Sequence, residues 1–498
     1  MSLLGLDVGS SACKAATFDE NGNLIAVASR EYSADVPRPD WVEMNPDVMW
    51  NAAVATIKEV CSKTSDPVRA LAISSHGETF IPVGADGKAV GPAIMNADNR
   101  ATEQVRFFNE NMGKERIYSI TGCVLHPMYA LLKILWLKQN RQDIYQNAIK
   151  FVGAGDYILG CMGFEAVTDH SIASRTMAFD VNRRAWSQEI IDIAGLRVDQ
   201  FPDARPSGTP VGRISGYMAD MLGVADGAVV ALGGHDQPCG ALGAGVVDSG
   251  DAADSAGTYE CLTVVSDKPT LGADALSHNL NSYCHLLHDK YVTLAFFPAG
   301  VVMRWFRDEF ASPEKDVSAS SKQDAYDLLT ANLSNDPSGI CFIPHFIGSG
   351  NPTWNVRATG VVVGLRPDRS RYHMFQAVME GVACELRINL GILQKLVGEI
   401  SVLRTTGGGA KSDYWMQLRA DITGKKVASM QSSEAVCLGA AVAAGVGAGV
   451  FNSLEDGSRI VAKFAKTFEP DIARGARYAE QIARYDKIYP ALAGSGVY

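Results

Sequence analysis

The stretch LLGLDVGSSACKAATFDENGNLIA, residues 3–26, decides how the chain starts to fold. It consists of three runs of apolar and small residues that are typical of strands, at 3–8, 12–19 and 23–30. Gly9-Ser10-Ser11 separates the first two runs, and a turn with Asn21-Gly22, a strong hairpin signal, separates the next two. The stretch therefore predicts an antiparallel meander of three strands.

The first turn of this meander is flanked by charged residues that a simple hairpin does not need. Asp7 lies just before it and Lys14 just after it, so a carboxylate, flexible backbone N–H groups and a cation occur together. Successive N–H groups in such a turn bind anions such as phosphate, and a carboxylate binds a metal ion. Taken alone, a tight turn without a ligand explains the same residues, so the rest of the sequence has to decide.

The chain continues as alternating helices and strands, which is typical of an α/β protein. A helix is predicted over 46–63 and an apolar strand over 69–74. Further helices are predicted at 99–112, 127–141 and 187–195.

A change of composition divides the chain near its middle. Residues 227–250, GAVVALGGHDQPCGALGAGVVDSG, are rich in Gly, Ala and Val. The next stretch, DAADSAGTYECLTVVSDKPTLG at 251–272, repeats the order of the N-terminus: an acid, small residues, a Gly-Thr turn and a β-branched strand. A chain of 498 residues is too long for one ordinary core. We therefore predict an N-terminal domain at 1–247 and a C-terminal domain at 248–498.

The C-terminal half contains another glycine-rich turn. ISVLRTTGGGAKS at 400–412 is typical of a strand, a glycine loop and a helix start, a junction that presents backbone N–H groups to a ligand. Apolar residues at helical spacing predict a long helix over 371–396. A second helix is predicted from an N-cap at Ser412 to Gly424, and a third over 434–448.

The composition narrows the classes of partner. With 45 Lys and Arg against 55 Asp and Glu, the formal charge is −10, and no dense basic block occurs, which argues against nucleic acid and acidic membranes. No stretch has the pattern of a signal peptide, and the apolar run at 438–450 is too short to span a bilayer. Ten dispersed cysteines without a CxxC pair indicate free thiols in a reducing compartment. We expect a cytoplasmic protein.

His235-Asp236 lies at the end of the apolar run that precedes the composition change. Taken singly, Asp236 is also a good helix N-cap, and Gly407-Gly408-Gly409 is also a flexible loop. Together with the turn after Asp7, they supply backbone donors for phosphate oxygens, a carboxylate near a metal ion and a proton acceptor. The set as a whole predicts phosphoryl transfer.

Two motifs carry a resemblance to a known family. The first is matched at every fixed position: Gly360-x-Val362-x-Gly364-Leu365, then seven residues, then His373-Met374-x-x-Ala377-Val378-Met379-Glu380. The second, MYALLKILWLKQ at 128–139, keeps Met128, Lys133, Leu135 and Trp136 but has Ala130 where Pro, Ser or Thr is usual. The sequence resembles the FGGY carbohydrate kinases, relatives of glycerol kinase and xylulose kinase, from residue 3 to about 450.

The resemblance implies a fold and a catalytic group. It implies two ribonuclease-H-like domains of the actin, sugar-kinase and heat-shock ATPase fold, which flank a deep cleft, with sugar held mainly by the first domain and Mg-ATP mainly by the second. Asp236 is then the base that accepts the proton of a sugar hydroxyl as this hydroxyl attacks the γ-phosphate. Asp7 lies on the Mg²⁺ side and acts through metal-bound water.

The same resemblance assigns the glycine turns to ATP. The residues expected at the nucleotide are Gly9, Ser10, Ser11, Lys14, Gly257, Thr258, Gly408, Gly409 and Ala410. For Lys14, a place on the strand surface is an equal alternative. Ser412 and Trp415 are expected to cap and pack the following helix. The small residues of 434–448 either approach the nucleotide or only allow close helix packing.

The expected sugar pocket departs from both well-known relatives. In SSHGETF at 74–80, Glu78 is expected to accept hydrogen bonds from sugar hydroxyls, and His76 either contacts the sugar or is a core histidine. Asp98 and Gln237 are further substrate candidates, with a structural role as the alternative for Asp98. Ser349-Gly350-Asn351 stands where relatives carry a charged pair with arginine, whose planar fork these side chains do not replace.

We therefore expect an ATP- and Mg²⁺-dependent kinase for a small ketose, deoxysugar or polyol, with a homodimer as the common arrangement among relatives. A catalytically silent sugar-binding regulator on the same fold is the alternative, although Asp7 and Asp236 are both retained. A chaperone-like or filament-forming ATPase of the wider fold lacks support from the stretch at 360–380.

Overall fold

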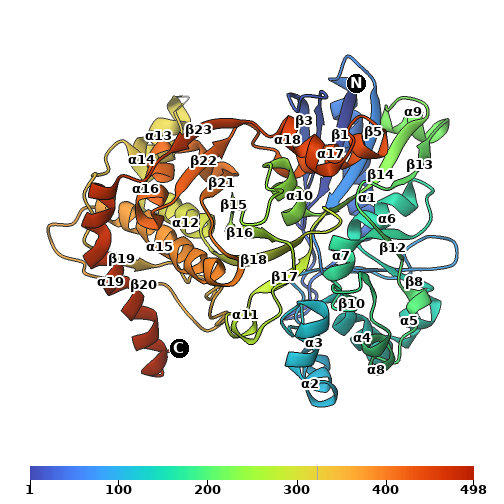
Figure 1. Cartoon of the computed structure of the whole chain (residues 1–498), viewed down its shortest axis with the longest axis horizontal. Coiled ribbons are helices and arrows are strands. Elements are labelled where there is room, and N and C mark those ends of the chain that lie inside the picture. The colour runs from blue at the N-terminus through green and yellow to red at the C-terminus, as the bar shows by residue number, and fades with distance from the viewer. Residues whose placement is uncertain (322) are drawn as a thin grey trace.

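The computed structural model describes residues 1–321 and 323–498. Figure 1 shows two sheet-centred units side by side, the first in blue to green and the second in yellow to red. Each unit is built on one large sheet with helices packed against it.

The first sheet has the strand order β13-β14-β5-β1-β2-β3. The predicted meander is confirmed: β1 (Ser2–Val8), β2 (Ala12–Phe18) and β3 (Leu24–Glu31) are antiparallel neighbours. β5 (Val68–Ser75) lies parallel to β1, and β14 (Ala228–His235) lies parallel to β5. β13 (Pro210–Ile214) closes one edge in the antiparallel sense.

The second sheet repeats this arrangement in the order β17-β18-β16-β15-β21-β22-β23. Its meander consists of β15 (Ala252–Ala256), β16 (Tyr259–Ser266) and β18 (Tyr291–Pro298). The parallel strands β21 (Val402–Thr406) and β22 (Lys426–Met430) follow, and β17 (Asn281–Cys284) and β23 (Phe464–Phe468) form the edges. The sequence echo at 251–272 therefore marks a structural repeat, and the predicted pair of ribonuclease-H-like units is confirmed.

The helices of the first half are α1 (Pro46–Ser62), α2 (Thr102–Asn111), α3 (Lys114–Thr121), α4 (Ala130–Asn140), α5 (Gln142–Asn147), α6 (Ala154–Cys161), α7 (His170–Ser174), α8 (Gln188–Ile193), η1 (Val198–Gln200), α9 (Tyr217–Leu222) and α10 (Asp236–Gly243). Those of the second half are α11 (Ala273–Ser277), α12 (Gly300–Phe310), α13 (Ser312–Ser320), α14 (Ala325–Thr330), α15 (Arg371–Val397), η2 (Gly408–Lys411), α16 (Asp413–Thr423), α17 (Ala435–Gly447), α18 (Leu454–Val461) and α19 (Ile472–Gly494).

Within residues 1–321 and 323–498, five two-stranded sheets accompany these elements. They are β4 (Glu43–Met44) with β7 (Ala93–Ile94), β6 (Ile81–Val83) with β8 (Lys150–Val152), β9 (Val167–Asp169) with β12 (Asp203–Arg205), β10 (Phe179–Asp180) with β11 (Ala185–Trp186), and β19 (Cys341–Ile343) with β20 (Val361–Val363).

Helix α16 has the boundaries that its end residues predict. The Ser412 hydroxyl accepts a hydrogen bond from the Trp415 N–H at 3.3 Å, and Gly424 ends the helix with a φ of 65°. A positive φ at this position favours glycine, and a serine side chain supplies the acceptor that a helix start needs. Trp415 is buried, so the prediction that these residues cap and pack the helix is confirmed.

Helix α17 comes from the second half of the chain but packs on strands β1, β5 and β14 of the first sheet and on α10. Figure 1 shows it, in orange-red, over the blue strands. A Cβ at Gly439 would lie 1.9 Å from the Cys239 carbonyl oxygen, and one at Gly5 would lie 1.8 Å from that of Cys437. Close backbone packing therefore requires these glycines, which supports the packing alternative for this helix.

Two further properties concern the whole described chain. No helix in residues 1–321 and 323–498 is long and apolar enough to cross a membrane. All ten cysteines are free thiols, and most of them are buried.

Candidate active site

The parallel strands of the first sheet end at one edge and bring three predicted site segments together. Val8 pairs with Ser75, and Ser75 pairs with His235. The turn at Gly9, the segment that follows Ser75, and Asp236 therefore start at neighbouring positions. In open α/β sheets, ligands bind outside such carboxyl ends of parallel strands.

The second sheet brings the two remaining glycine turns together in the same way. Ser255 at the end of β15 pairs with Thr406 at the end of β21, so the Gly257-Thr258 turn and the loop from Gly407 lie side by side. Gly407 has a φ of 87°, and a Cβ there would lie 2.7 Å from the Ala256 carbonyl oxygen. The loop then forms the short helix η2, whose first N–H groups have no partner within the helix.

The turn after β1 is closed by its own backbone. The Gly9 N–H donates to the Ala12 carbonyl at 2.9 Å, and the Tyr32 hydroxyl donates to the Gly9 carbonyl at 2.6 Å. Ser10 and Ser11 are exposed. The structure therefore holds this turn rigidly while leaving its two hydroxyls accessible to a ligand.

Asp7 offers an oxygen without a protein partner. Its Oδ1 is buried and forms no hydrogen bond within the described residues. Burial raises the pKa of Asp7 to about 6, and the nearby Lys14 opposes this shift. No group of three or more His, Cys, Asp or Glu in the described chain could hold a metal ion. An orphaned carboxylate oxygen fits Mg²⁺, which keeps most of its waters and binds through one or two carboxylates together with phosphates.

Asp236 is the first residue of α10, and one of its two oxygens is already engaged. The Gln237 N–H donates to Oδ1 at 2.6 Å, and His235 Nε2 lies 3.2 Å from the same oxygen. The side chain is 27% exposed. Burial raises the pKa of Asp236 to about 8, with further contributions from the charges of Asp7 and Glu78. The carboxyl group therefore titrates close to neutral pH, and its ionised form can accept a proton.

Glu78 lies in a buried ion pair that the sequence did not predict. The Arg175 Nε donates to Glu78 Oε1 at 2.6 Å, and both side chains are buried. Glu78 adopts a φ of 62°, which is unusual for a non-glycine residue. The Arg175 guanidinium carbon lies 5.3 Å from the ring centroid of Tyr129 and 4.6 Å from that of Tyr283, and its buried Nη1 has no hydrogen-bond partner among the described residues.

Helix α7 positions Arg175 and the end of β14. Asp169 caps this helix by accepting hydrogen bonds from the N–H groups of Ser171 and Ile172. The Ser171 hydroxyl in turn accepts from the His235 N–H at 2.8 Å. No local sequence pattern indicated Arg175, because its partner Glu78 lies 97 positions away in the chain.

The other sugar-pocket candidates have protein partners of their own. His76 Nδ1 lies 2.8 Å from the Val8 carbonyl oxygen and Nε2 lies 2.8 Å from the Thr79 hydroxyl, so both ring nitrogens are engaged. Asp98 is fully buried and accepts hydrogen bonds from the Val42 N–H and the Arg100 side chain. Gln237 is half-buried next to Asp236. These contacts favour the core alternative for His76 and the structural alternative for Asp98.

The segment that departs from the relatives, Ser349-Gly350-Asn351, is held by hydrogen bonds within the second half. The Asn351 side chain accepts from the Phe296 N–H at 2.9 Å and donates to the Asn279 carbonyl at 2.7 Å. Trp354 follows and stacks on the ring of His126 from the first half, at 4.7 Å between centroids. The segment itself therefore belongs to the second half, and Trp354 after it contacts the first half.

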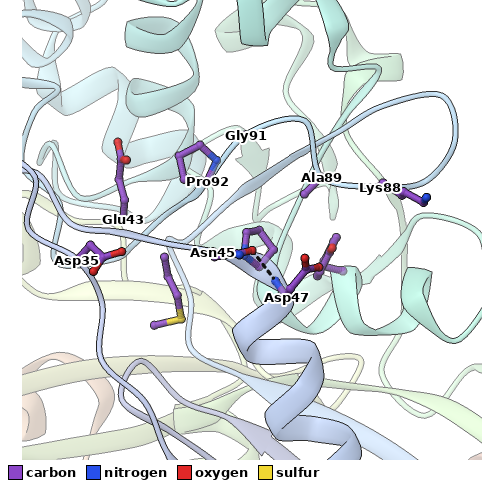
Figure 2. A pocket seen from close by; sticks show the side chains of 11 residues that line it. Asp35, Glu43, Asn45, Asp47, Lys88, Ala89, Gly91 and Pro92 are labelled. Carbon is purple, nitrogen blue, oxygen red and sulfur yellow. Dashed lines mark hydrogen bonds between the residues drawn. The ribbon is translucent and has the colours of Figure 1, made fainter.

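A cavity of about 520 Å³ lies at the start of α1, away from these residues (Figure 2). Two of its polar side chains form structural contacts. Asn45 accepts a hydrogen bond from the Asp47 N–H at 3.0 Å, and Glu43 forms an ion pair with Arg100 at 2.7 Å. None of the predicted site residues lines this cavity.

The chain is similar to known proteins over most of its length. The model of the FGGY family of carbohydrate kinases, N-terminal domain, matches residues 2–243, and that of the C-terminal domain matches residues 252–448. The gluconokinase of Bacillus subtilis (strain 168) is 29% identical over 447 residues, which cover 88% of this chain and 86% of that protein. The autoinducer-2 kinase of Escherichia coli (strain SMS-3-5 / SECEC) is 30% identical over 509 residues, which cover 98% of this chain and 94% of that protein.

Two solved structures are similar over the whole chain. The ligand-bound xylulose kinase of Lactobacillus acidophilus superposes with a TM-score of 0.89 at 25% identity and covers 99% of both chains. The glycerol kinase of Plasmodium falciparum with ADP has a TM-score of 0.83 at 22% identity, covers 97% of this chain and 98% of that one, and supports the fold alone. Since both family models match and together span most of the sequence, the chain belongs to the FGGY family of carbohydrate kinases, phosphotransferases whose acceptor is an alcohol group.

Proposed function

We propose that this kinase transfers the γ-phosphate of Mg-ATP to a hydroxyl of a small sugar or polyol, with Asp236 as the base. The observation that carries the proposal is the position of Asp236 at the strand ends shared with Asp7 and the Gly9 turn. Its Oδ1 is held by the Gln237 N–H, while Oδ2 forms no hydrogen bond within the described part of the chain. A free carboxylate oxygen is the group that an acceptor hydroxyl needs.

Asp236 would orient the hydroxyl and take its proton late, because an alcohol is too weak an acid to ionise beforehand at neutral pH. A general base of this kind contributes roughly 10²–10⁴ in rate. Asp7 would hold Mg²⁺ through water, and the bound ion would neutralise charge on the phosphates.

The three glycine turns would bind the nucleotide. Ser10 and Ser11 would donate to the transferred phosphate, with Lys14 behind them; Gly9 would only shape this turn, because its own N–H donates to the Ala12 carbonyl. Gly257 and Thr258 would form a second phosphate loop, and Gly408, Gly409 and Ala410 would hold the nucleotide. The pairing of β15 with β21, which places the last two turns side by side, supports this assignment.

Glu78 and Gln237 are the residues that we assign to the sugar, because both belong to segments that start at the same strand ends as Asp236. The names of the relatives cover gluconate, xylulose, glycerol and autoinducer-2. The acceptor is therefore sought among small polyhydroxylated compounds.

A coupled assay of ADP release tests the proposal across pentuloses, hexuloses, tetritols, pentitols and gluconate. We expect release that depends on one of these compounds and is lost in Asp236→Asn, while that variant still binds the compound in calorimetry. Tight binding without turnover by the wild-type protein would instead support a silent sugar-binding regulator. ATP hydrolysis that is independent of sugar would contradict the proposal.

A further inference from the structure

His235 lies between the proposed base and a tyrosine from the other half of the chain. Its Nε2 is 3.2 Å from Asp236 Oδ1, and its Nδ1 is 3.3 Å from the Tyr283 hydroxyl oxygen. The rings of His235 and Tyr283 meet edge to face, with centroids 5.5 Å apart and planes at 88°. Both side chains are buried.

The surroundings decide which ring nitrogen carries the hydrogen. Burial lowers the pKa of His235 well below its usual value, so the imidazole is neutral and has one N–H. Burial also raises the pKa of Tyr283 well above its usual value, so its hydroxyl keeps its proton. When Asp236 is ionised, which is the form that acts as a base, an Nδ1–H tautomer would leave the lone pair of Nε2 in contact with the carboxylate. The favourable arrangement has Tyr283 donating to Nδ1 and the N–H on Nε2, in electrostatic contact with Asp236 Oδ1 at 3.2 Å.

We propose that His235 and Tyr283 are positioning residues that fix the orientation of the Asp236 carboxylate. His235 and the Gln237 N–H both lie against Oδ1, which leaves Oδ2 for the acceptor hydroxyl. Tyr283 sets the tautomer of His235. This inference rests on the proposed role of Asp236 and adds how the base is held.

The pair also favours the ionised form of Asp236. The titratable and charged groups around His235 and Asp236 are Asp7 on β1, His76 and Glu78 after β5, Arg175 after α7, Cys239 on α10, Cys261 on β16 and Tyr283 on β17. Asp7 and Glu78 disfavour a third negative charge, and Arg175 opposes them. The partial positive charge of an N–H on Nε2, 3.2 Å from Oδ1, adds to the effect of Arg175 without adding net charge.

Tyr283 ties this arrangement to the contact between the two units. It belongs to β17 of the second sheet, while His235 and Asp236 belong to the first unit. Its ring also stacks on the Arg175 guanidinium at 4.6 Å. The orientation of the base therefore depends on how the second unit lies against the first.

Three substitutions test the proposal with the full-length enzyme and the acceptor found in the screen. His235→Phe removes the N–H, and we expect kcat to fall roughly tenfold to a hundredfold, as for a misplaced catalytic group, with the sugar KM changed less than about twofold. The acidic limb of the pH profile should move to higher pH. His235→Gln keeps an N–H near the position of Nε2 and should restore most of kcat. Tyr283→Phe removes only the hydroxyl and should cost about threefold to tenfold.

His170→Gln is the matched control, because His170 is a buried histidine of α7 that does not contact Asp236. It should leave kcat and the pH profile unchanged. Wild-type kcat and an unmoved acidic limb in His235→Phe would overturn the proposal, as would a His235→Gln variant as slow as His235→Phe. If His235→Phe does not fold, an unchanged kcat in Tyr283→Phe is the overturning result. Full turnover in Asp236→Asn would instead refute the proposed base itself.

Discussion

Lys14 Nζ lies 2.8 Å from Glu434 Oε2, and this ion pair joins the two halves of the chain beside the first glycine turn. Lys14 pairs with Asp7 in the register of β1 and β2, and Glu434 is the residue before α17. A phosphate bound at the turn would therefore compete with Glu434 for the ammonium group.

The first prediction is that Lys14→Met raises the KM for ATP about tenfold, because a charge-assisted contact to phosphate is lost. The free energy of unfolding should fall by about 1 kcal/mol or less, since the pair with Glu434 is partly exposed. Kinetics at varied ATP and thermal unfolding measure the two effects. Glu434→Gln breaks the same pair but keeps the cation, so it should leave the KM unchanged. An equal rise in both variants would assign the effect to the ion pair rather than to a lysine–phosphate contact.

The second prediction concerns the pH dependence of the reaction. Burial raises the pKa of Asp7 to about 6 and that of Asp236 to about 8. A base acts only in its ionised form, so kcat/KM for the sugar should rise with pH from about 6 through about 8 and level off only above the pKa of Asp236. A pH series with the coupled assay measures this limb. A profile that is flat across the range would contradict the assigned base.

The third prediction is that Asp236 lowers the free energy of unfolding at the higher pH values at which it is ionised and can act as a base. Its pKa in the folded protein is raised to about 8, so its contribution to stability is greatest at low pH and is lost as the pH rises through that value. Asp236→Asn cannot ionise and keeps an acceptor for the Gln237 N–H. We expect it to be more stable than the wild type at about pH 8.5, by on the order of 2 kcal/mol, with the difference absent near pH 3.5. Thermal unfolding at both pH values measures this, and equal stability at the higher value would argue against a raised pKa.

Local sequence signals predicted those elements that depend on residues close together in the chain. The meander, the N-cap at Ser412 and the stop at Gly424 are each specified by residues within a few positions of one another. The repeat of the strand order was visible only as a weak echo, because sheet pairing joins residues far apart in the chain. The sequence signal for the packing of α17 on the first sheet was no more than a stretch of small residues.

The same difference between local and distant contacts explains why only part of the candidate site was predicted. Asp7 and Asp236 adjoin strand ends and glycine turns, which is a recognisable local pattern. Arg175 and Tyr283 lie more than a hundred positions apart and meet only after both sheets have formed. Tyr283 is also a buried aromatic residue on an edge strand, which the sequence cannot distinguish from ordinary core.

The fourth prediction tests the loop that we assign to the nucleotide. Gly407→Ala would force a left-handed φ on alanine and place its Cβ 2.7 Å from the Ala256 carbonyl oxygen. We expect a loss of about 1–2 kcal/mol in stability and a severalfold rise in the KM for ATP. Gly160→Ala in α6 is the control, because a Cβ there has no neighbour within 4 Å among the described residues and alanine suits a helix, so the KM for ATP should not change and the stability should not fall. A destabilised Gly407→Ala with an unchanged KM would exclude this loop from the nucleotide site.

The last prediction separates two possible roles of Glu78, which are binding the sugar and pairing with the buried Arg175. Glu78→Gln leaves the Arg175 guanidinium buried without its charge partner, so we expect a loss of about 3–5 kcal/mol in stability and a higher KM for the sugar. The double variant Glu78→Gln with Arg175→Met removes both charges, and it should regain most of the stability. Thermal unfolding and sugar KM are measured for both variants. If Glu78 binds the sugar, the double variant regains stability but keeps the high KM. If Glu78 only holds Arg175, stability and KM recover together.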